Sequence, residues 1–267
     1  MISCIDYVEM CKKNIAAEVS GMKKPPRLVV IQVGDNPASN SYIKSKATLC
    51  EEVGIDMWHI RYGEGILPQE LYANIQALND NSDVDGIIVQ LPLPKEFDVQ
   101  YIQNLISPEK DVDGFRVDSK FISCTPKGIM DYLTDNGVTF RGKNAVVIGR
   151  SEIVGRPLVN LLIKAGATVT CCNSATKNLA WFTKNADIVV SAVGKAKILG
   201  PEYFADNQIV VDVGINRDEN GKLCGDVDRL AVEEAYDIFV TPVPKGVGKL
   251  TVCSLAKNTL EATKYRV

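Results

Sequence analysis

The chain has 267 residues, a formal net charge of −3 and a hydrophobic content of 46%. This length accommodates two compact domains, and the composition is that of an ordinary globular protein rather than a disordered or fibrous one. The slight negative charge argues against a surface that coats nucleic acid, so we expect no nucleic-acid partner. No apolar segment is long enough to cross a bilayer, and we expect neither a membrane partner nor a signal peptide.

The eight cysteines and the single histidine do not form a disulfide or metal pattern. No C-x-x-C pair occurs and most cysteines lie within apolar runs, which predicts free thiols in a reducing cytoplasm. His59 lies in an alternating run that is typical of a half-buried strand. We therefore expect neither a histidine-based metal site nor a Ser-His-Asp triad.

The first half of the chain predicts an α/β unit. Apolar residues recur at helical spacing over the first twenty residues, until Pro25 and Pro26 end the helix. The pattern then predicts strands at 28–33, 56–62 and 86–91, and helices at 38–53 and 68–79. Prolines and charges predict irregular chain between residues 92 and 125.

The second half predicts a doubly wound parallel sheet. A helix over 127–136 precedes the β-branched run Val146–Ile148, and further strands are expected at 168–172, 187–193, 208–213 and 237–241. Helix-length segments separate the first three of these later strands. The segment 241–248 is too rich in proline and glycine for regular structure, and a final helix is expected over 251–264.

The residues after Ile148 are typical of an anion-binding turn. Gly149 ends the strand, Ser151 is expected to cap the following helix, and Gly155 completes the turn. A helix N-terminus with free backbone N–H groups favours the pyrophosphate of a dinucleotide. The glycine spacing differs from the G-x-G-x-x-G fingerprint, so a plain strand-to-helix turn is the alternative.

Tyr42 and Lys46 lie one turn apart on the same face of a predicted helix. A lysine stem packed on a tyrosine ring is the ordinary meaning of this spacing. Gln90 at the end of a strand and Asp113 in the irregular segment add polar groups near the sheet edge where α/β proteins bind ligands. A lysine there can move a proton, an amide can hold the lysine, and a carboxylate can accept from a nitrogen heterocycle.

The Y-x-x-x-K spacing also occurs in short-chain dehydrogenases. In those enzymes the pair follows the dinucleotide turn within one domain, whereas Tyr42 and Lys46 precede the turn at Gly149. This order argues against that class.

Six blocks of sequence resemble the methylenetetrahydrofolate dehydrogenase/methenyltetrahydrofolate cyclohydrolase family in order and spacing over nearly the whole chain. The blocks are Val33-Gly-Asp-Asn-Pro-Ala-Ser39, Tyr42-x-x-x-Lys46, Val89-Gln-Leu-Pro-Leu-Pro94, Lys110-Asp-Val-Asp-Gly-Phe115, Gly149-Arg-Ser-x-Ile-Val-Gly-Arg-Pro157 and Val240-Thr-Pro-Val-Pro244.

The resemblance implies a fold with two α/β domains flanking a cleft, the second a Rossmann-like doubly wound parallel sheet. Residues 1–122 with 250–267 would form the catalytic folate-binding domain, and residues 123–249 the dinucleotide-binding domain. The implied enzyme oxidises 5,10-methylenetetrahydrofolate with NADP and hydrolyses the methenyl product to 10-formyltetrahydrofolate. A homodimer that pairs through the nucleotide domain is also implied.

The resemblance assigns roles residue by residue. Lys46 would be the catalytic lysine, with Tyr42 packing against the folate, Gln90 tuning the lysine and Asp113 binding the pterin-like ring. The substrate-binding residues would be Tyr42, Lys46, Gln90, Leu91, Pro92, Asp113, Pro244 and Gly246. The cofactor-binding residues would be Gly149, Arg150, Ser151, Ile153, Val154, Gly155, Ser174 and Ile215. No metal is implied.

Charge near the turn favours NADP over NAD. An acidic residue at the end of the second nucleotide strand usually selects NAD, and the chain has Cys172-Asn-Ser174 there instead. Arg150 and Ser174 suit a 2′-phosphate, although Glu152 would repel it. NAD stays the alternative.

Two segments depart from the family pattern. The segment 116–123 is shorter than the family loop, and Lys245 stands where the family favours glycine. A left-handed backbone costs a lysine about 1 kcal/mol, so we expect a different backbone at Lys245. These departures leave open a monofunctional dehydrogenase or a catalytically silent nucleotide-binding protein. The presence of Lys46, Gln90 and Asp113 argues against the first of these.

Overall fold

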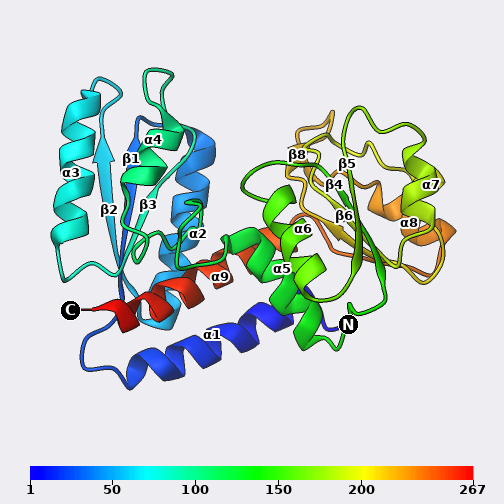
Figure 1. Cartoon of the computed structure of the whole chain (residues 1–267), viewed down its shortest axis with the longest axis horizontal. Helices are drawn as coiled ribbons and strands as arrows, with labels where there is room; N and C mark the ends of the chain where they lie inside the picture. The colour runs from blue at the N-terminus through cyan, green and yellow to red at the C-terminus, as the bar shows by residue number, and fades with distance from the viewer. Residues whose placement is uncertain (267) are drawn as a thin grey trace. The chain divides into compact units, whose positions relative to one another are not determined.

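The computed structural model describes residues 1–266, which form two compact units (Figure 1). One unit comprises residues 9–124 and the C-terminal segment from Val252, and the other comprises residues 1–8 and 125–251. The chain passes between the units within helix α1 (Cys4–Ser20), at the start of α5 (Cys124–Asp135) and within α9 (Val247–Ala262). The functional assignment of the two predicted domains stays a prediction.

The unit of residues 9–124 contains a three-stranded parallel sheet with the strand order β2-β1-β3. Its elements are β1 (Arg27–Val33), α2 (Pro37–Val53), β2 (Asp56–Tyr62), α3 (Pro68–Asp80), β3 (Gly86–Val89) and α4 (Val99–Leu105). β1 is buried along almost its whole length because it is the central strand. The predicted strand 56–62 has the bounds of β2.

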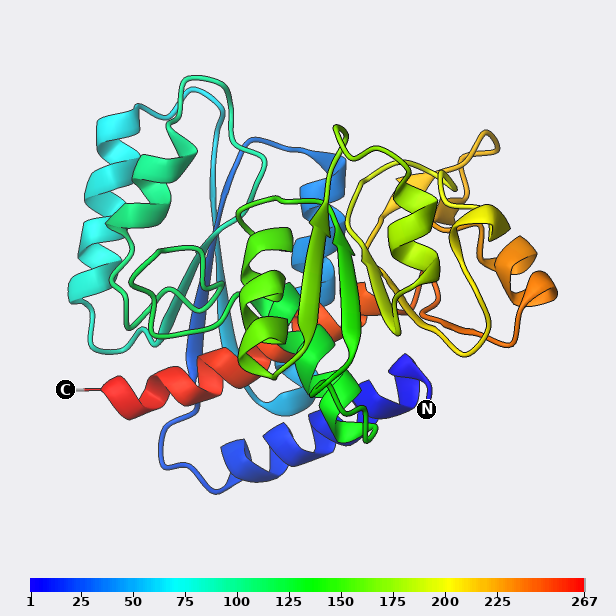
Figure 2. The same cartoon turned by 45° about the vertical axis from the view of Figure 1, so that its right-hand side comes forward.

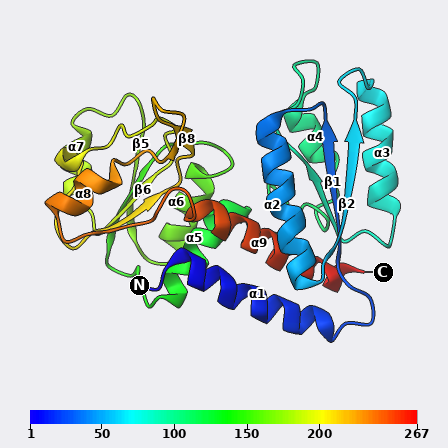
Figure 3. The same ribbon diagram turned by 180° about the vertical axis from the view of Figure 1, so that it is seen from behind.

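Alternating residues of β1 build the core on one face of this sheet. Val29, Ile31 and Val33 pack with Leu71 of α3 and Ile102 of α4. Helix α2 covers the opposite face, as Figures 1 and 3 show from the two sides. The carboxyl ends of β1 and β3 therefore open beside the first turns of α2.

The second unit contains a five-stranded parallel sheet with the strand order β10-β7-β6-β4-β5. Its strands are β4 (Asn144–Ile148), β5 (Thr168–Cys172), β6 (Ile188–Ser191), β7 (Ile209–Asp212) and β10 (Phe239–Val240), with a separate hairpin of β8 (Asn216–Arg217) and β9 (Leu223–Cys224). The helices are α6 (Gly155–Lys164), α7 (Leu179–Lys184), the 3₁₀ helix η1 (Pro201–Tyr203) and α8 (Arg229–Ala235). The predicted α/β class with parallel sheets is confirmed.

The core of this unit follows the same alternation. Val146 and Ile148 of β4 pack with Val189, Phe204 and Val232 in one buried cluster. Helix α6 lies along β4 and β5, and α7 and α8 lie on the other side of the strands (Figure 2). Burial on both faces explains why β4 and β6 read as continuous apolar runs.

Three predicted boundaries are wrong. Helix α6 begins at Gly155 with Val154 as its N-cap, so Ser151 is not the N-cap residue. The residues between Ser151 and Gly155 form a tight turn, in which Ser151 Oγ accepts from Gly155 N at 3.3 Å. Helix α9 begins at Val247, within the segment expected to be irregular. Strand β3 ends at Val89, which leaves Gln90 and Leu91 outside the ladder.

Two connections also differ from the prediction. The segment 92–125 contains α4, which Asp98 caps by accepting from Tyr101 N at 3.0 Å, so it is not wholly irregular. Between β6 and β7 only η1 forms, because the segment holds Gly194 and Lys197 in left-handed conformations that interrupt a helix.

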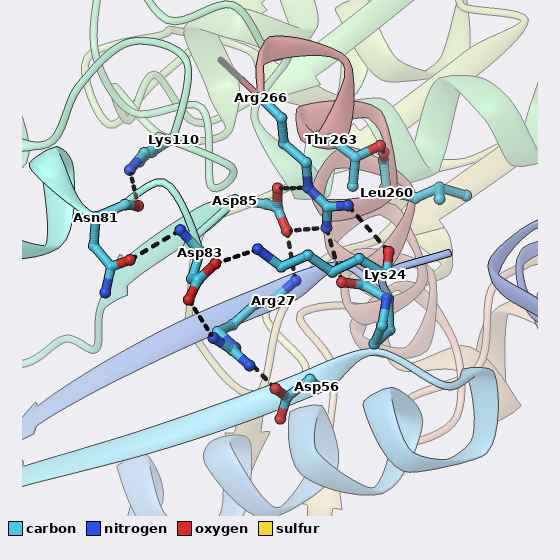
Figure 4. Close-up of polar contacts among 11 residues, drawn as sticks. Lys24, Arg27, Asp56, Asn81, Asp83, Asp85, Lys110, Leu260, Thr263 and Arg266 are labelled. Carbon is cyan, nitrogen blue, oxygen red and sulfur yellow. Dashed lines mark hydrogen bonds and ion pairs between the residues drawn. The ribbon is translucent and has the colours of Figure 1, made fainter. Parts of the chain in front are cut away.

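The C-terminal segment is anchored at the amino edge of the first sheet (Figure 4). Arg266 donates to both carboxylate oxygens of Asp85, at 2.6 and 2.7 Å, and to the carbonyl oxygens of Lys24 and Pro25. Asp85 also accepts from Arg27 N at 2.7 Å. This clamp lies at the end of the strands opposite to Gln90.

Across residues 1–266, no helix combines the length and apolar character needed to cross a membrane. All eight cysteines are free thiols, as predicted. Their placement in a reducing cytoplasm stays a prediction.

Candidate functional site

Helix α2 carries Tyr42 and Lys46 because its first turn is well capped. The Asn36 side chain accepts from Ala38 N at 2.9 Å and from Ser39 N at 3.2 Å. Such a cap satisfies N–H groups that the helix itself cannot pair. The helix thereby begins at the carboxyl edge of the sheet and presents Lys46 there.

Lys46 and Gln90 form the central polar contact of this unit. Lys46 Nζ donates to Gln90 Oε1 at 3.0 Å, and Gln90 Nε2 donates to the carbonyl of Leu91 at 2.8 Å. The second bond orients the amide so that its oxygen faces the lysine. Within residues 1–266, Lys46 forms no ion pair, so its Nζ is held by a neutral amide.

The backbone around Gln90 is fixed from two sides. Gln90 N donates to Ile31 O of β1 at 2.8 Å, and Ser39 Oγ of α2 donates to Leu91 O at 3.2 Å. The Leu91–Pro92 peptide bond is cis. Three of the predicted substrate-binding residues, Gln90, Leu91 and Pro92, therefore form one short segment attached to both β1 and α2.

The charges of Asp113 and Lys46 both act on the thiol of Cys124. Burial raises the pKa of the Cys124 thiol well above its usual value, the charge of Asp113 raises it further, and the charge of Lys46 lowers it. Burial likewise raises the pKa of Cys50 to about 12, against a lowering by Lys46. Neither thiol is a nucleophile in this state. The three predicted residues Lys46, Gln90 and Asp113 thus belong to one unit, and the first two are in direct contact.

The shortened segment 116–123 is an ordered loop attached to Asp111. Arg116 N donates to Asp111 Oδ2 at 2.9 Å, and Ser119 Oγ donates to Asp111 O at 3.1 Å. The Arg116 guanidinium pairs with Asp118 and donates to the carbonyl of Ile106 at 3.0 Å. These bonds attach the chain on either side of Asp113 to Asp111, so the shorter segment is held in place.

Tyr42 keeps an exposed ring face. Its side chain is 41% exposed, and partial burial raises the pKa of its hydroxyl. The ring lies one turn before Lys46 on α2, where a flat ligand can stack on it.

Pro244 and Gly246 belong to the other unit, in the turn before α9. A Cβ atom at Gly246 would lie 2.0 Å from Pro242 O, so only glycine fits there. Lys245 has φ +77°, which is the left-handed conformation. The expectation of a different backbone is wrong, because the tight packing of Gly246 holds the turn and the lysine adopts the strained conformation.

The turn after β4 can hold a dinucleotide phosphate. A Cβ atom at Gly155 would lie 2.3 Å from Gly149 O, and one at Gly149, where φ is +120°, would lie 2.4 Å from Ala192 O. The two glycines thus bring three backbone segments into direct contact at the start of α6. This close approach of backbone to backbone, open to an anion at a helix N-terminus, fits the pyrophosphate of NADP.

The charged groups around this turn fit an additional phosphate. Arg150 is exposed and forms no ion pair within the described residues, and Ser174 is exposed in the turn after β5. Because Ile148 pairs with Cys172, these turns follow neighbouring strand ends. Glu152 forms an ion pair with Arg156 at 2.5 Å, which offsets the repulsion expected from its charge.

The remaining predicted cofactor residues are placed as surface groups around the turn. Ile153 is 40% exposed and Ile215 is 49% exposed, whereas Val154 is half-buried as the N-cap of α6. Gly248 would place a Cβ atom 3.8 Å from the Ile215 side chain. Ile215 therefore lies beside the first turn of α9.

The sequence reasoning missed Ser39 and two buried carboxylates, Asp212 and Asp226. Asp212 is the last residue of β7 and accepts from the backbone N–H groups of Gly214, Asp226 and Val227. Burial raises the pKa of Asp212 to about 6, and the nearby charge of Asp226 adds to the shift. An aspartate within an apolar run, as in Val-Val-Asp-Val, was the available sign of such a buried acid.

Two domain families match the chain in succession. Residues 2–113 match the catalytic domain of tetrahydrofolate dehydrogenase/cyclohydrolase, and residues 123–267 match its NAD(P)-binding domain. The bifunctional protein FolD of Acidovorax sp. (strain JS42) is 45% identical over 266 residues, covering 95% of this chain and 94% of that protein.

Solved structures agree with this match. The bifunctional FolD methylenetetrahydrofolate dehydrogenase/cyclohydrolase of Campylobacter jejuni superposes with a TM-score of 0.95 at 40% identity, covering 99% of this chain and 98% of that one. The Trypanosoma brucei enzyme, solved with NADP and an inhibitor, superposes with a TM-score of 0.91 at 30% identity, covering 99% and 97%. The chain therefore belongs to the tetrahydrofolate dehydrogenase/cyclohydrolase family.

Proposed function

We propose that this protein oxidises 5,10-methylenetetrahydrofolate to the 5,10-methenyl form with NADP and hydrolyses that product to 10-formyltetrahydrofolate. The observation that carries the proposal is the 3.0 Å hydrogen bond from Lys46 Nζ to Gln90 Oε1 beside the exposed ring of Tyr42. A dehydrogenase alone has no use for such a lysine, because hydride transfer from this substrate requires positioning rather than a protein acid or base.

In the oxidation, the bound nicotinamide supplies the hydride acceptor. The chain itself would position this cofactor. Gly149 and Gly155 lack the Cβ atoms that would crowd the turn, so the pyrophosphate would lie close to the backbone, and the exposed Arg150 and Ser174 would hold the 2′-phosphate. The absence of an acid between Cys172 and Lys177 removes the group that would select NAD. The pairing of Glu152 with Arg156 supports the same choice.

In the hydration, a water oxygen bonds to the methenyl carbon and loses a proton. Lys46 Nζ, as the neutral amine, accepts this proton and returns it to the ring nitrogen when the bond between that nitrogen and the carbon breaks. The remaining hydroxyl proton passes to solvent, which leaves the formyl group on the other nitrogen. Gln90 holds Nζ in place, and the Asp113 carboxylate accepts N–H groups of the pterin-like ring. The net reaction consumes one water and releases one proton.

We extend the proposal to the organisation of the chain. The sheet that carries Gln90 and the helix that carries Lys46 belong to the catalytic domain of residues 1–122 with 250–267, and residues 123–249 bind the dinucleotide. The protein acts in the cytoplasm as a homodimer paired through the nucleotide domain. Light scattering of the purified chain tests the dimer by its mass.

The activity is tested by supplying methylenetetrahydrofolate with NADP or NAD and following reduced nicotinamide and the methenyl product separately. We expect reduction with NADP and no lasting accumulation of the methenyl form. Lack of reduction with both cofactors refutes an enzymatic function, and accumulation of the methenyl form refutes the hydration step.

The role of Lys46 is tested with Lys46→Met, which should abolish hydration and leave NADP binding unchanged. Lys44→Met is the matched control, since Lys44 is exposed on the same helix. Equal losses in both variants would contradict the assignment.

A further inference from the structure

Asp226 is a fully buried carboxylate that no step of the proposed reaction uses. Its side chain is 0% exposed, and within residues 1–266 it forms no ion pair with a lysine or arginine. Five donors satisfy it instead. Oδ2 accepts from Ser191 Oγ at 2.9 Å and Val193 N at 2.7 Å.

The other oxygen of Asp226 holds the same loop and one further segment. Oδ1 accepts from Gly194 N and Lys195 N, each at 3.0 Å, and from Asn216 Nδ2 at 2.9 Å. Three consecutive backbone N–H groups, of Val193, Gly194 and Lys195, therefore wrap around one carboxylate. Burial of an acid without a cation is costly, and such a set of donors is the means of offsetting that cost.

The loop that Asp226 holds lies at the point where the sheet changes direction. In the order β10-β7-β6-β4-β5, the chain moves from β4 outward to β5 and then back across to β6, so the switch point lies between β4 and β6. Dinucleotides bind in the crevice at the carboxyl ends of such strands. Ala192 follows β6 and its carbonyl meets Gly149, where a Cβ atom would lie only 2.4 Å away.

The second segment that Asp226 holds reaches the same edge of the sheet. Asn216 follows Ile215 after β7, and its amide is fixed to Oδ1. A Cβ atom at Gly214 would lie 2.2 Å from that oxygen, so the backbone here is packed directly on the carboxylate. The single carboxylate of Asp226 thus binds both the loop that follows β6 and the segment that follows β7.

We infer that Asp226 is the positioning residue of the dinucleotide site: it touches no ligand and acts by holding residues 192–195 and 214–216 in the shape that receives NADP. The inference rests on the proposed NADP binding. All five donors to the Asp226 carboxylate belong to this chain, so the loop is held by the protein's own groups. Loss of these bonds frees the loop and weakens nucleotide binding, while the lysine site in the other unit is unaffected.

Asp226→Asn tests this with nearly the same side-chain shape. An amide group replaces one acceptor oxygen, so at least two of the five donors face an N–H₂ group and lose their partner. We expect the dissociation constant for NADP, measured by calorimetry, to rise at least tenfold. The backbone N–H groups of 193–195 should exchange faster with deuterium in the nucleotide-free protein, and methenyl hydrolysis without nucleotide should keep its wild-type rate.

Asp187→Asn is the matched control. Asp187 precedes β6 at the opposite edge of the same sheet and accepts from Asn144 N and Lys143 Nζ, each at 2.8 Å. It should leave both NADP affinity and loop exchange unchanged. A folded Asp226→Asn variant with wild-type affinity and wild-type exchange overturns the inference.

A milder variant keeps the test decisive if Asp226→Asn does not fold. Ser191→Ala removes one donor to Oδ2 at a fully buried position that no cofactor can touch. We expect a twofold to fivefold weaker affinity and faster exchange at Val193, and unchanged values overturn the inference. If the wild-type protein does not bind NADP, the proposed function is refuted instead. Deuterium exchange at residues 193–195 still tests whether Asp226 holds that loop.

Discussion

Removing the Arg266 side chain should destabilise the unit that contains Lys46 by about 3–5 kcal/mol, because it leaves a buried carboxylate without its cation. The Asp85 side chain is 1% exposed and accepts two bonds from the guanidinium, at 2.6 and 2.7 Å. Among the described residues, the other donor to Asp85 is Arg27 N, a single backbone group. The carbonyls of Lys24 and Pro25 also lose donors, which adds to the cost (Figure 4).

The two tryptophans allow this unit to be followed by itself. Trp58 lies on β2 with the Arg27 guanidinium 4.0 Å from its ring centre, and Trp181 lies in the other unit. In a Trp181→Phe background, fluorescence reports Trp58 alone during unfolding in guanidinium chloride. We therefore expect Arg266→Ala to move this transition to lower denaturant.

Two comparisons decide whether the buried charge is the cause. The double variant Asp85→Leu with Arg266→Met removes both partners and should recover most of the lost stability, since an apolar pair replaces a buried ion pair at little cost. Lys264→Ala removes an exposed cation two residues away and should change stability by less than about 0.5 kcal/mol. A loss below about 1 kcal/mol for Arg266→Ala, or a double variant as unstable as Arg266→Ala, would refute the reasoning.

Three further outcomes follow from single contacts. Gly155→Ala should destabilise the unit that contains β4 and α6 by about 1–3 kcal/mol, because the new Cβ atom would lie 2.3 Å from Gly149 O. Thermal unfolding measures this loss, and Gly248→Ala is the control, since a Cβ atom there would lie 3.8 Å from the Ile215 side chain. Burial raises the pKa of Asp111 to about 6, so its contribution to stability is present at low pH and is lost as the pH rises through 6. Urea unfolding should show the wild type losing stability relative to Asp111→Asn between about pH 4 and pH 7, and parallel curves would contradict this. Ser39→Ala removes one of the two donors to the Leu91 carbonyl and leaves Gln90 Nε2 as the other. It should slow methenyl hydrolysis several-fold without changing NADP affinity, which kinetic and binding assays can separate.

Most of the secondary structure could be predicted because its causes are local. Asn36 and Gly54 mark the two ends of α2, and alternating or β-branched runs gave β2 and β5 with their observed bounds. The failures lie where proline and glycine obscure a local pattern. Helix α4 forms after a proline-rich segment because Asp98 caps it, and α6 begins only at Gly155 because the turn closes onto Gly149.

Part of the candidate site could likewise be predicted from local sequence, and the rest required the tertiary structure. The spacing of four residues on a helix is sufficient to place Tyr42 and Lys46 on one face, and the glycines at 149 and 155 indicate a phosphate-binding turn without any knowledge of the fold. Only the tertiary structure brings Gln90 to Lys46, since the two residues are 44 positions apart and meet because β3 lies beside β1 at the start of α2. Asp226 is the extreme case: its donors come from two segments, residues 191–195 and Asn216, and burial of its charge becomes favourable only when both of them reach it.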